Sequence, residues 1–185
     1  MRYLLLSLII LSVLCSCANP LNQATFNRYR QQGIAAESQG DWPAAEKAYY
    51  RAAENVRWGH LGDELESDSL YNLGRVKRIV GKLEESEALL KRGIVIDEKL
   101  HGKEGFLVSY SLLELAETYY QAKKYDEGIQ VLSRILPIAQ QNQQKYTPQS
   151  KQFMKEVFGR YHDLLLQKGR LADAEKFRTA TDLFK

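Results

Sequence analysis

Cysteine, histidine and proline are scarce in this chain. Among its 185 residues there are 2 cysteines, 3 histidines and 4 prolines. Cys15 and Cys17 both lie close to the amino terminus, so the rest of the chain cannot form an internal disulfide. The histidines lie far apart, with no companion at metal-ligand spacing: His60, His101 and His162. This spacing argues against a zinc site, and we expect no metal and no cofactor.

The chain also lacks a charge of one sign. Its 26 lysines and arginines are interleaved with 23 acidic residues, for a formal net charge of +3. Without a basic run, nucleic acid is not an expected partner. The sequence contains no glycine-rich phosphate loop and no nucleophile elbow, and no serine is placed for a His and Asp pairing. We therefore predict that the protein is not an enzyme.

The amino terminus has the pattern of an export signal. A positive charge at Arg2 precedes an apolar stretch over residues 3–14, which is too short to span a bilayer as a helix. The motif Leu14-Cys15-Ser16-Cys17 follows and resembles the lipobox of bacterial lipoproteins, in which the last cysteine becomes the lipid-bearing first residue. The alternatives are an ordinary cleaved signal or an uncleaved anchor, but a lone amino-terminal cysteine favours lipidation.

The lipobox resemblance implies a domain plan and a location. Residues 1–16 would be the signal peptide, Cys17 the acylated residue, and residues 17–25 the lipidated terminus and a polar tether. Ala18 follows the cysteine, where Asp would retain a lipoprotein in the inner membrane. The expected location is the periplasmic face of the bacterial outer membrane, with the membrane contacted through the amino-terminal lipid.

A repeated pattern of turns organises residues 26–185. Candidate turns at Gly40, Gly81, Lys123 and Gly169 are spaced by 41, 42 and 46 residues. Large apolar residues stand two positions after each turn: Trp42, Leu83, Tyr125 and Leu171. Small residues stand five positions after it: Ala45, Ser86, Gly128 and Ala174. Seven positions before it are Gly33, Gly74, Ala116 and then His162, which breaks the pattern.

These positions resemble the tetratricopeptide repeat signature, in the longer variant of kinesin light chains. The resemblance implies an all-α fold, a right-handed superhelix of about four helix-turn-helix repeats over residues 26–62, 63–104, 105–146 and 147–185. Asp41 is a candidate N-cap, Thr147 and Pro148 should begin the seventh helix, and Pro137 should kink or end the sixth. The bulky His162 suggests weaker packing in the fourth repeat.

The first helix of each repeat lines the concave surface of such a solenoid, which is where partners are expected to bind. Candidate partner-binding residues are found by counting in steps of 3, 4 and 3 along these helices. Asn72 is added because the family resemblance implies that it bonds to the backbone of a bound peptide. The full set is Arg30, Tyr71, Asn72, Arg75, Arg78, Tyr110, Leu113, Glu117 and Tyr120. Tyrosine and arginine are enriched in protein-binding hot spots. The alternative is that these are ordinary half-exposed helix faces.

Three functions compete at this stage. The first is a non-catalytic adaptor for another envelope protein or peptide segment, in pilus, outer-membrane or cell-wall assembly. The second is a receptor for a small molecule or peptidoglycan fragment in the concave groove. The third, an enzyme, would need Glu114, Glu117 and His162 together, and their repeat positions do not bring all three to one point. Self-association through Leu183 and Phe184 of the last helix is a further possibility.

Overall fold

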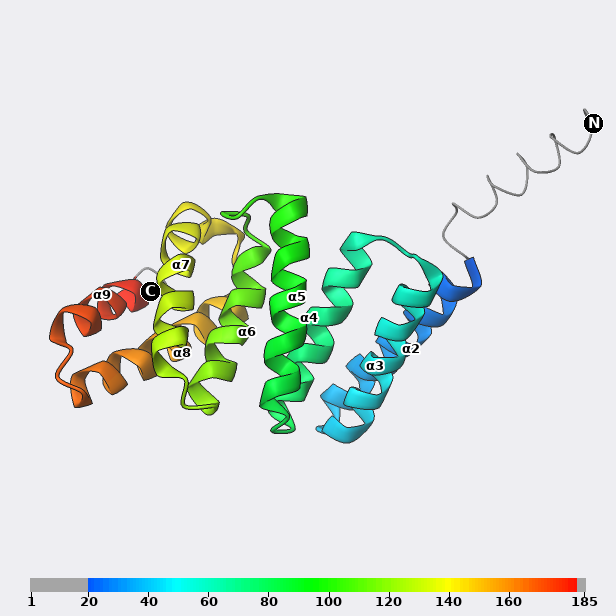
Figure 1. The fold of residues 1–185 in the computed structure, drawn as a ribbon, viewed down its shortest axis with the longest axis horizontal. Helices are drawn as coiled ribbons and strands as arrows, with labels where there is room; N and C mark the ends of the chain where they lie inside the picture. The colour runs from blue at the N-terminus through cyan, green and yellow to red at the C-terminus, as the bar shows by residue number, and fades with distance from the viewer. Residues whose placement is uncertain (1–19, 183–185) are drawn as a thin grey trace, which may run out of the picture. The chain divides into compact units, whose positions relative to one another are not determined.

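The computed structural model describes residues 20–182, which form eight α-helices and one short 3₁₀ helix and contain no strand. The helices, in chain order, are α2 (Pro20–Ser38), α3 (Trp42–Gly59), α4 (Asp63–Ile79), α5 (Leu83–His101), α6 (Val108–Gln121), α7 (Tyr125–Gln141), η1 (Gln143–Lys145), α8 (Pro148–Gln167) and α9 (Leu171–Asp182). Figure 1 shows them as successive antiparallel pairs. The predicted all-α fold of helix-turn-helix pairs is confirmed. The chain divides into two compact units, Met1–Ser69 and Leu70–Lys185, with the boundary inside α4.

The first unit contains α2, α3 and the first two turns of α4. Asp41 caps α3 as predicted, because its carboxylate accepts a hydrogen bond from the Ala44 N–H at 3.0 Å. Phe26 of α2 packs with Ala52 and Val56 of α3 in a small buried core. The helices approach closely at Gly33, where an added Cβ would stand 2.7 Å from the Tyr49 ring.

The predicted tether is partly wrong. Helix α2 begins at Pro20 instead of residue 26, so residues 20–25 are helical, and the remainder of the tether lies outside the described residues. Proline is favoured in the first turn of a helix because its missing N–H has no partner there in any case. Tertiary packing also holds this first turn, since Asn22 lies against Gly59 near the end of α3.

The second unit is built around α6, whose residues from Val108 to Tyr119 are all buried except the half-exposed Tyr110. Helices α5, α7 and α8 contact it, and the shared core includes Leu90, Leu112 and Phe158. The intra-pair turns at Gly81, Lys123 and Gly169 each contain a residue with positive φ, which lets the chain reverse directly after a helix end. These turns fall where the repeat pattern placed them.

Two sequence expectations in the second unit have different outcomes. Thr147 caps α8 as predicted, with its hydroxyl accepting from the Ser150 N–H at 3.2 Å. Pro137 does not end its helix, because α7 continues to Gln141. Pro137 has no N–H, so the carbonyl of Ser133 loses its helical hydrogen-bond partner. Pro137 lies on the exposed side of α7, and Ser133, four residues earlier, lies on the same side. Water can therefore donate a hydrogen bond to that carbonyl.

His162 also has a different place from the one its repeat position suggested. Its side chain is 22% exposed, and its Nδ1 lies 2.9 Å from the Asp163 carboxylate. In this helix pair Phe158 packs against Phe177, with ring centres 5.6 Å apart. The fourth pair therefore packs through large aromatic residues, and its helix contact needs no small side chain at position 162.

Candidate functional site

The candidate partner-binding residues divide between the two units. Arg30 lies on α2 in the first unit, and its Nε is buried without a hydrogen-bond partner. The other eight lie on α4 and α6, in the second unit. Within that unit the first helices of the pairs are α4, α6 and α8, and we call their shared surface the first-helix face. It includes Tyr71, Arg75, Arg78, Tyr110, Glu114, Glu117, Tyr120 and Arg160.

A buried ion pair joins α4 to α6 on the first-helix face. Arg78 donates from Nε at 3.0 Å, and from a terminal nitrogen at 2.9 Å, to one oxygen of Glu114. The two side chains are only 11% and 4% exposed. Burial raises the pKa of Glu114, while the positive charges of Arg78 and Arg75 oppose that rise. Arg78 is thus held by the protein itself, and a partner would meet a neutralised charge.

A second ion pair joins α6 to α8. A terminal nitrogen of Arg160 donates to Glu117 at 2.6 Å, and the Gln121 amide donates to the other oxygen of Glu117 at 3.2 Å. The Glu117 side chain is 6% exposed. The Arg160 guanidinium also lies 5.8 Å from the centre of the Tyr120 ring. The sequence did not identify Arg160, because the fourth repeat departs from the pattern and its outward-facing positions could not be counted.

Three tyrosines of the first-helix face remain half-exposed: Tyr71, Tyr110 and Tyr120. Burial raises the pKa of Tyr71, and the nearby carboxylate of Glu114 adds to that rise, so the phenol stays protonated and able to donate. Tyr110 donates a long hydrogen bond of 3.4 Å to the Ser150 hydroxyl of α8. These three side chains pack against the core of the second unit and are only partly buried.

Leu113 is a correction to the predicted set. It is 1% exposed and belongs to the hydrophobic core of the second unit, so its side chain is not available to a partner. The 3, 4, 3 count placed it on the outer stripe, but α6 is covered by neighbours on more than one side, including α5, α7 and α8. Asn72 and Arg75 are half-buried on α4.

The enzyme-like cluster considered from the sequence is held by three different partners. Glu114 pairs with Arg78, Glu117 pairs with Arg160, and the His162 ring nitrogen contacts Asp163. Each carboxylate is therefore occupied by a structural ion pair. Among residues 20–182 there is no group of three potential metal ligands. In the same part of the chain no helix is long and apolar enough to cross a membrane.

A further ionic cluster ties α5 to the turn before α7. The Glu87 carboxylate accepts from Lys91 at 2.6 Å and from Lys124 at 2.7 Å, and the Tyr119 hydroxyl donates to it at 3.2 Å. Partial burial would raise the pKa of Glu87, but the hydrogen bonds from Lys124 and Lys91 outweigh it and lower the pKa overall. This cluster is a structural link between two successive helix pairs.

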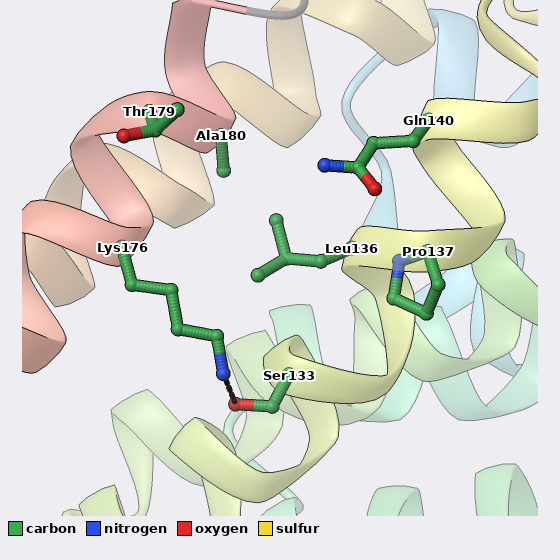
Figure 2. A pocket seen from close by; sticks show the side chains of 7 residues that line it. All are labelled: Ser133, Leu136, Pro137, Gln140, Lys176, Thr179 and Ala180. Atoms are coloured by element: carbon green, nitrogen blue, oxygen red, sulfur yellow. Dashed lines mark hydrogen bonds between the residues drawn. The ribbon is translucent and has the colours of Figure 1, made fainter.

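A pocket of about 470 Å³ lies between α7 and α9, on the side of the second helices (Figure 2). Its lining residues are Ser133, Leu136, Pro137, Gln140, Lys176, Thr179 and Ala180. Lys176 reaches across it and donates to the Ser133 hydroxyl at 3.4 Å, as the dashed line in Figure 2 shows. No sequence motif marked this pocket, because its walls come from two repeats and have no shared pattern.

The predicted self-association through Leu183 and Phe184 concerns residues outside the described part of the chain.

Comparisons with known proteins agree with this architecture. Residues 65–141 match the family model described as tetratricopeptide repeat. BtubC (BKLC) from P. vanneervenii has a similar structure, with a TM-score of 0.74 and 17% identity, over 86% of this chain and 62% of that one. A putative kinesin light chain from Podosopora anserina, with nearly identical TPR-like repeats, has a TM-score of 0.69 and 16% identity, over 84% of this chain and 72% of that one.

No curated protein sequence matches this chain significantly. The chain also spans less than two thirds of the length of BtubC, so that protein supports the fold and no more. The predicted resemblance to repeats of the kinesin-light-chain type is nevertheless confirmed at the level of structure. Residues 65–141 thus match the tetratricopeptide repeat family, and the chain as described has a tetratricopeptide-type fold of paired helices.

Proposed function

We propose that this protein is a lipid-anchored, non-catalytic adaptor that binds a protein or peptide segment on its first-helix face. Helical-repeat folds of this kind are interaction folds, because stacked first helices form an extended binding surface. The observation that carries the proposal is the set of half-exposed tyrosines Tyr71, Tyr110 and Tyr120, on helices tied together by buried ion pairs. Tyrosine is among the residues that dominate protein-binding energies.

The ion pairs favour one kind of partner over another. Arg78 and Glu117 are already neutralised by Glu114 and Arg160, so these side chains offer little charge to a strongly acidic or basic tail. The tyrosine rings offer apolar area and phenol groups on a backbone that loses little entropy on binding. An extended segment with apolar or aromatic side chains therefore suits this face better than a highly charged one.

Site-directed photocrosslinking in intact cells tests the binding face. A photoreactive benzoylphenylalanine at Tyr110 or Tyr120 should give one discrete adduct, and the same residue at Val95 of α5 should not. Val95 is the matched control because it is 66% exposed and lies on a second helix. Adducts of the same size from all three positions, or none from the tyrosine positions, would contradict the proposed face.

The membrane part of the proposal rests on the lipobox at Cys17, which lies outside the described residues. Labelled palmitate should enter the wild-type chain and be lost in Cys17→Ser, whereas Cys15→Ser should still be labelled. Fractionation should then place the labelled protein in the outer membrane, with the folded part on the periplasmic side. Label that survives Cys17→Ser would end the lipoprotein interpretation while leaving the binding face to be judged by its own experiment.

A further inference from the structure

Two apolar side chains are strongly exposed at one end of the first unit. Leu21 is 75% exposed in the first turn of α2, and Trp58 is 70% exposed in the last turn of α3. The two helix ends are in contact, since a Cβ added to Gly59 would stand 2.6 Å from the Cβ of Asn22. Figure 1 shows α2 and α3 side by side and antiparallel, so the start of one helix meets the end of the other. We call this the α2/α3 end.

The polar atoms around Trp58 are already satisfied within the protein. Its indole Nε1 donates to the Glu54 carboxylate at 3.0 Å, and Arg57 donates to the same oxygen at 2.9 Å. The Arg57 guanidinium lies 4.7 Å from the centre of a Trp58 ring. The ring can therefore leave bulk water without stranding its N–H, and the adjacent charges balance each other. Tryptophan with a nearby arginine is the combination found at membrane interfaces.

Chain length places this end near the membrane. Four residue steps separate Cys17 from Leu21, which is about 14 Å when fully extended. An acyl chain on Cys17 would keep that cysteine at the bilayer surface, so Leu21 could not lie much farther from the surface than this. The head-group regions of the two leaflets together add about 10–15 Å to the hydrocarbon core, so the near head groups are within reach of an apolar end held this close.

We propose that the α2/α3 end docks on a phospholipid bilayer, with Leu21 and Trp58 inserted among the lipid head groups. The inference rests on the proposed lipidation of Cys17. Because Arg57 and Glu54 neutralise each other, the attraction is apolar and does not require anionic lipid. Docking would fix the orientation of the first unit against the membrane instead of leaving it on a loose tether.

The chain contains 2 tryptophans, and their fluorescence reports on two different positions along one helix. Trp42 begins α3 and Trp58 lies near its end, about 24 Å away along the helix axis. The test uses the processed chain, coupled through Cys17 to a maleimide lipid in phosphatidylcholine vesicles with brominated acyl chains. In Trp42→Phe, which keeps Trp58, emission should be quenched relative to plain vesicles and shifted to the blue. In Trp58→Phe, which keeps Trp42, it should be unchanged.

A pair of leucine variants separates docking of the α2/α3 end from non-specific adsorption of the protein to the vesicle. In the Trp42→Phe background, Leu21→Glu should abolish the quenching of Trp58, while Leu171→Glu should preserve it. Leu171 is a matched control because it is 65% exposed but lies on α9 in the second unit. Circular dichroism of each variant checks that the helices are intact. Vesicle coupling replaces cellular lipidation, so the palmitate experiment can fail while this one succeeds, and the reverse.

Two results would overturn the inference. Trp58 emission that is identical in brominated and plain vesicles would show that the α2/α3 end stays in water. Equal quenching of Trp42 and Trp58 would show adsorption without the proposed orientation. Quenching confined to Trp58 and lost in Leu21→Glu would support the docking surface.

Discussion

Gly128 of α7 is the position where a single methyl group should do the most damage. A Cβ added there would stand 1.7 Å from the Tyr161 hydroxyl oxygen and 2.5 Å from the ring carbon that bears it. Tyr161 is fully buried and cannot swing into solvent. Its hydroxyl also donates a hydrogen bond to the Ala116 carbonyl of α6 at 2.8 Å. Gly128→Ala must therefore displace a buried aromatic ring that links α6, α7 and α8.

The size of the effect follows from three terms. Overpacking a well-filled core costs about 1–3 kcal/mol. Losing the Tyr161 hydrogen bond costs about 0.5–1.5 kcal/mol more. Alanine is favoured over glycine inside a helix by about 0.5–1 kcal/mol, which offsets part of the loss. Gly128→Ala should thus destabilise the protein by about 0.5–4 kcal/mol, and each kcal/mol lowers the melting temperature by about 2–4 °C.

Gly159 of α8 is the matched control, because among residues 20–182 no atom beyond its own helix backbone and chain neighbours lies within 4 Å of a Cβ added there. Gly159→Ala should raise stability by about 0.5–1 kcal/mol through helix propensity alone. Thermal melts followed by circular dichroism compare the two. In a Tyr161→Phe background the cost of Gly128→Ala should shrink, although the ring carbon still leaves a residual contact. If Gly128→Ala stabilises the protein as Gly159→Ala does, the inferred contact between α7 and α8 is wrong.

Three further predictions follow from single residues. Gly62 has a φ of +99°, so Gly62→Ala should cost about 1–2 kcal/mol through backbone strain, and an unchanged melting temperature would contradict that conformation. Glu114→Ala should lower the free energy of unfolding, measured in urea, by about 3–5 kcal/mol, because it leaves the buried Arg78 guanidinium without its carboxylate. Arg57→Ala removes an exposed ion pair and should lower it by about 0–1 kcal/mol. Equal losses in the two variants would refute this distinction. The pKa of Glu87 is lowered in the fold, so its ionised form adds stability above the ordinary carboxyl pKa range, and this stability is lost as the pH falls. Glu87→Gln should therefore flatten the acid side of a plot of melting temperature against pH. An unchanged slope would argue against this role.

Local rules explain why the helix pairs could be predicted from the sequence. Small residues such as Gly74 and Gly128 stand where helices meet, and large residues such as Leu90 fill the space opposite. Asp41 and Thr147 cap helices through bonds that span only three residues, so neighbouring sequence is enough to identify them. The helix pairs therefore followed from periodicity and turn chemistry, while the superhelical fold was implied by the resemblance to tetratricopeptide repeats.

The candidate site depended on contacts that periodicity does not encode. A helical count assigns Arg78 and Glu117 to an outward stripe, but their partners Glu114 and Arg160 lie 36 and 43 residues away, on the next first helix. Whether such side chains meet depends on the angle and offset between successive pairs, which are set by packing of the whole core. The same packing covers α6 on several sides and takes Leu113 out of reach.

The sequence by itself determined that the chain forms helix pairs and where those pairs turn back. Tertiary structure decided which charges are neutralised, which tyrosines stay half-exposed, and that the apolar side chains of Leu21 and Trp58 share one end of a helix pair. The reason is physical. Hydrogen bonds within a helix and caps link residues a few positions apart, whereas burial and ion pairing depend on distances that the chain sets only when its helices pack.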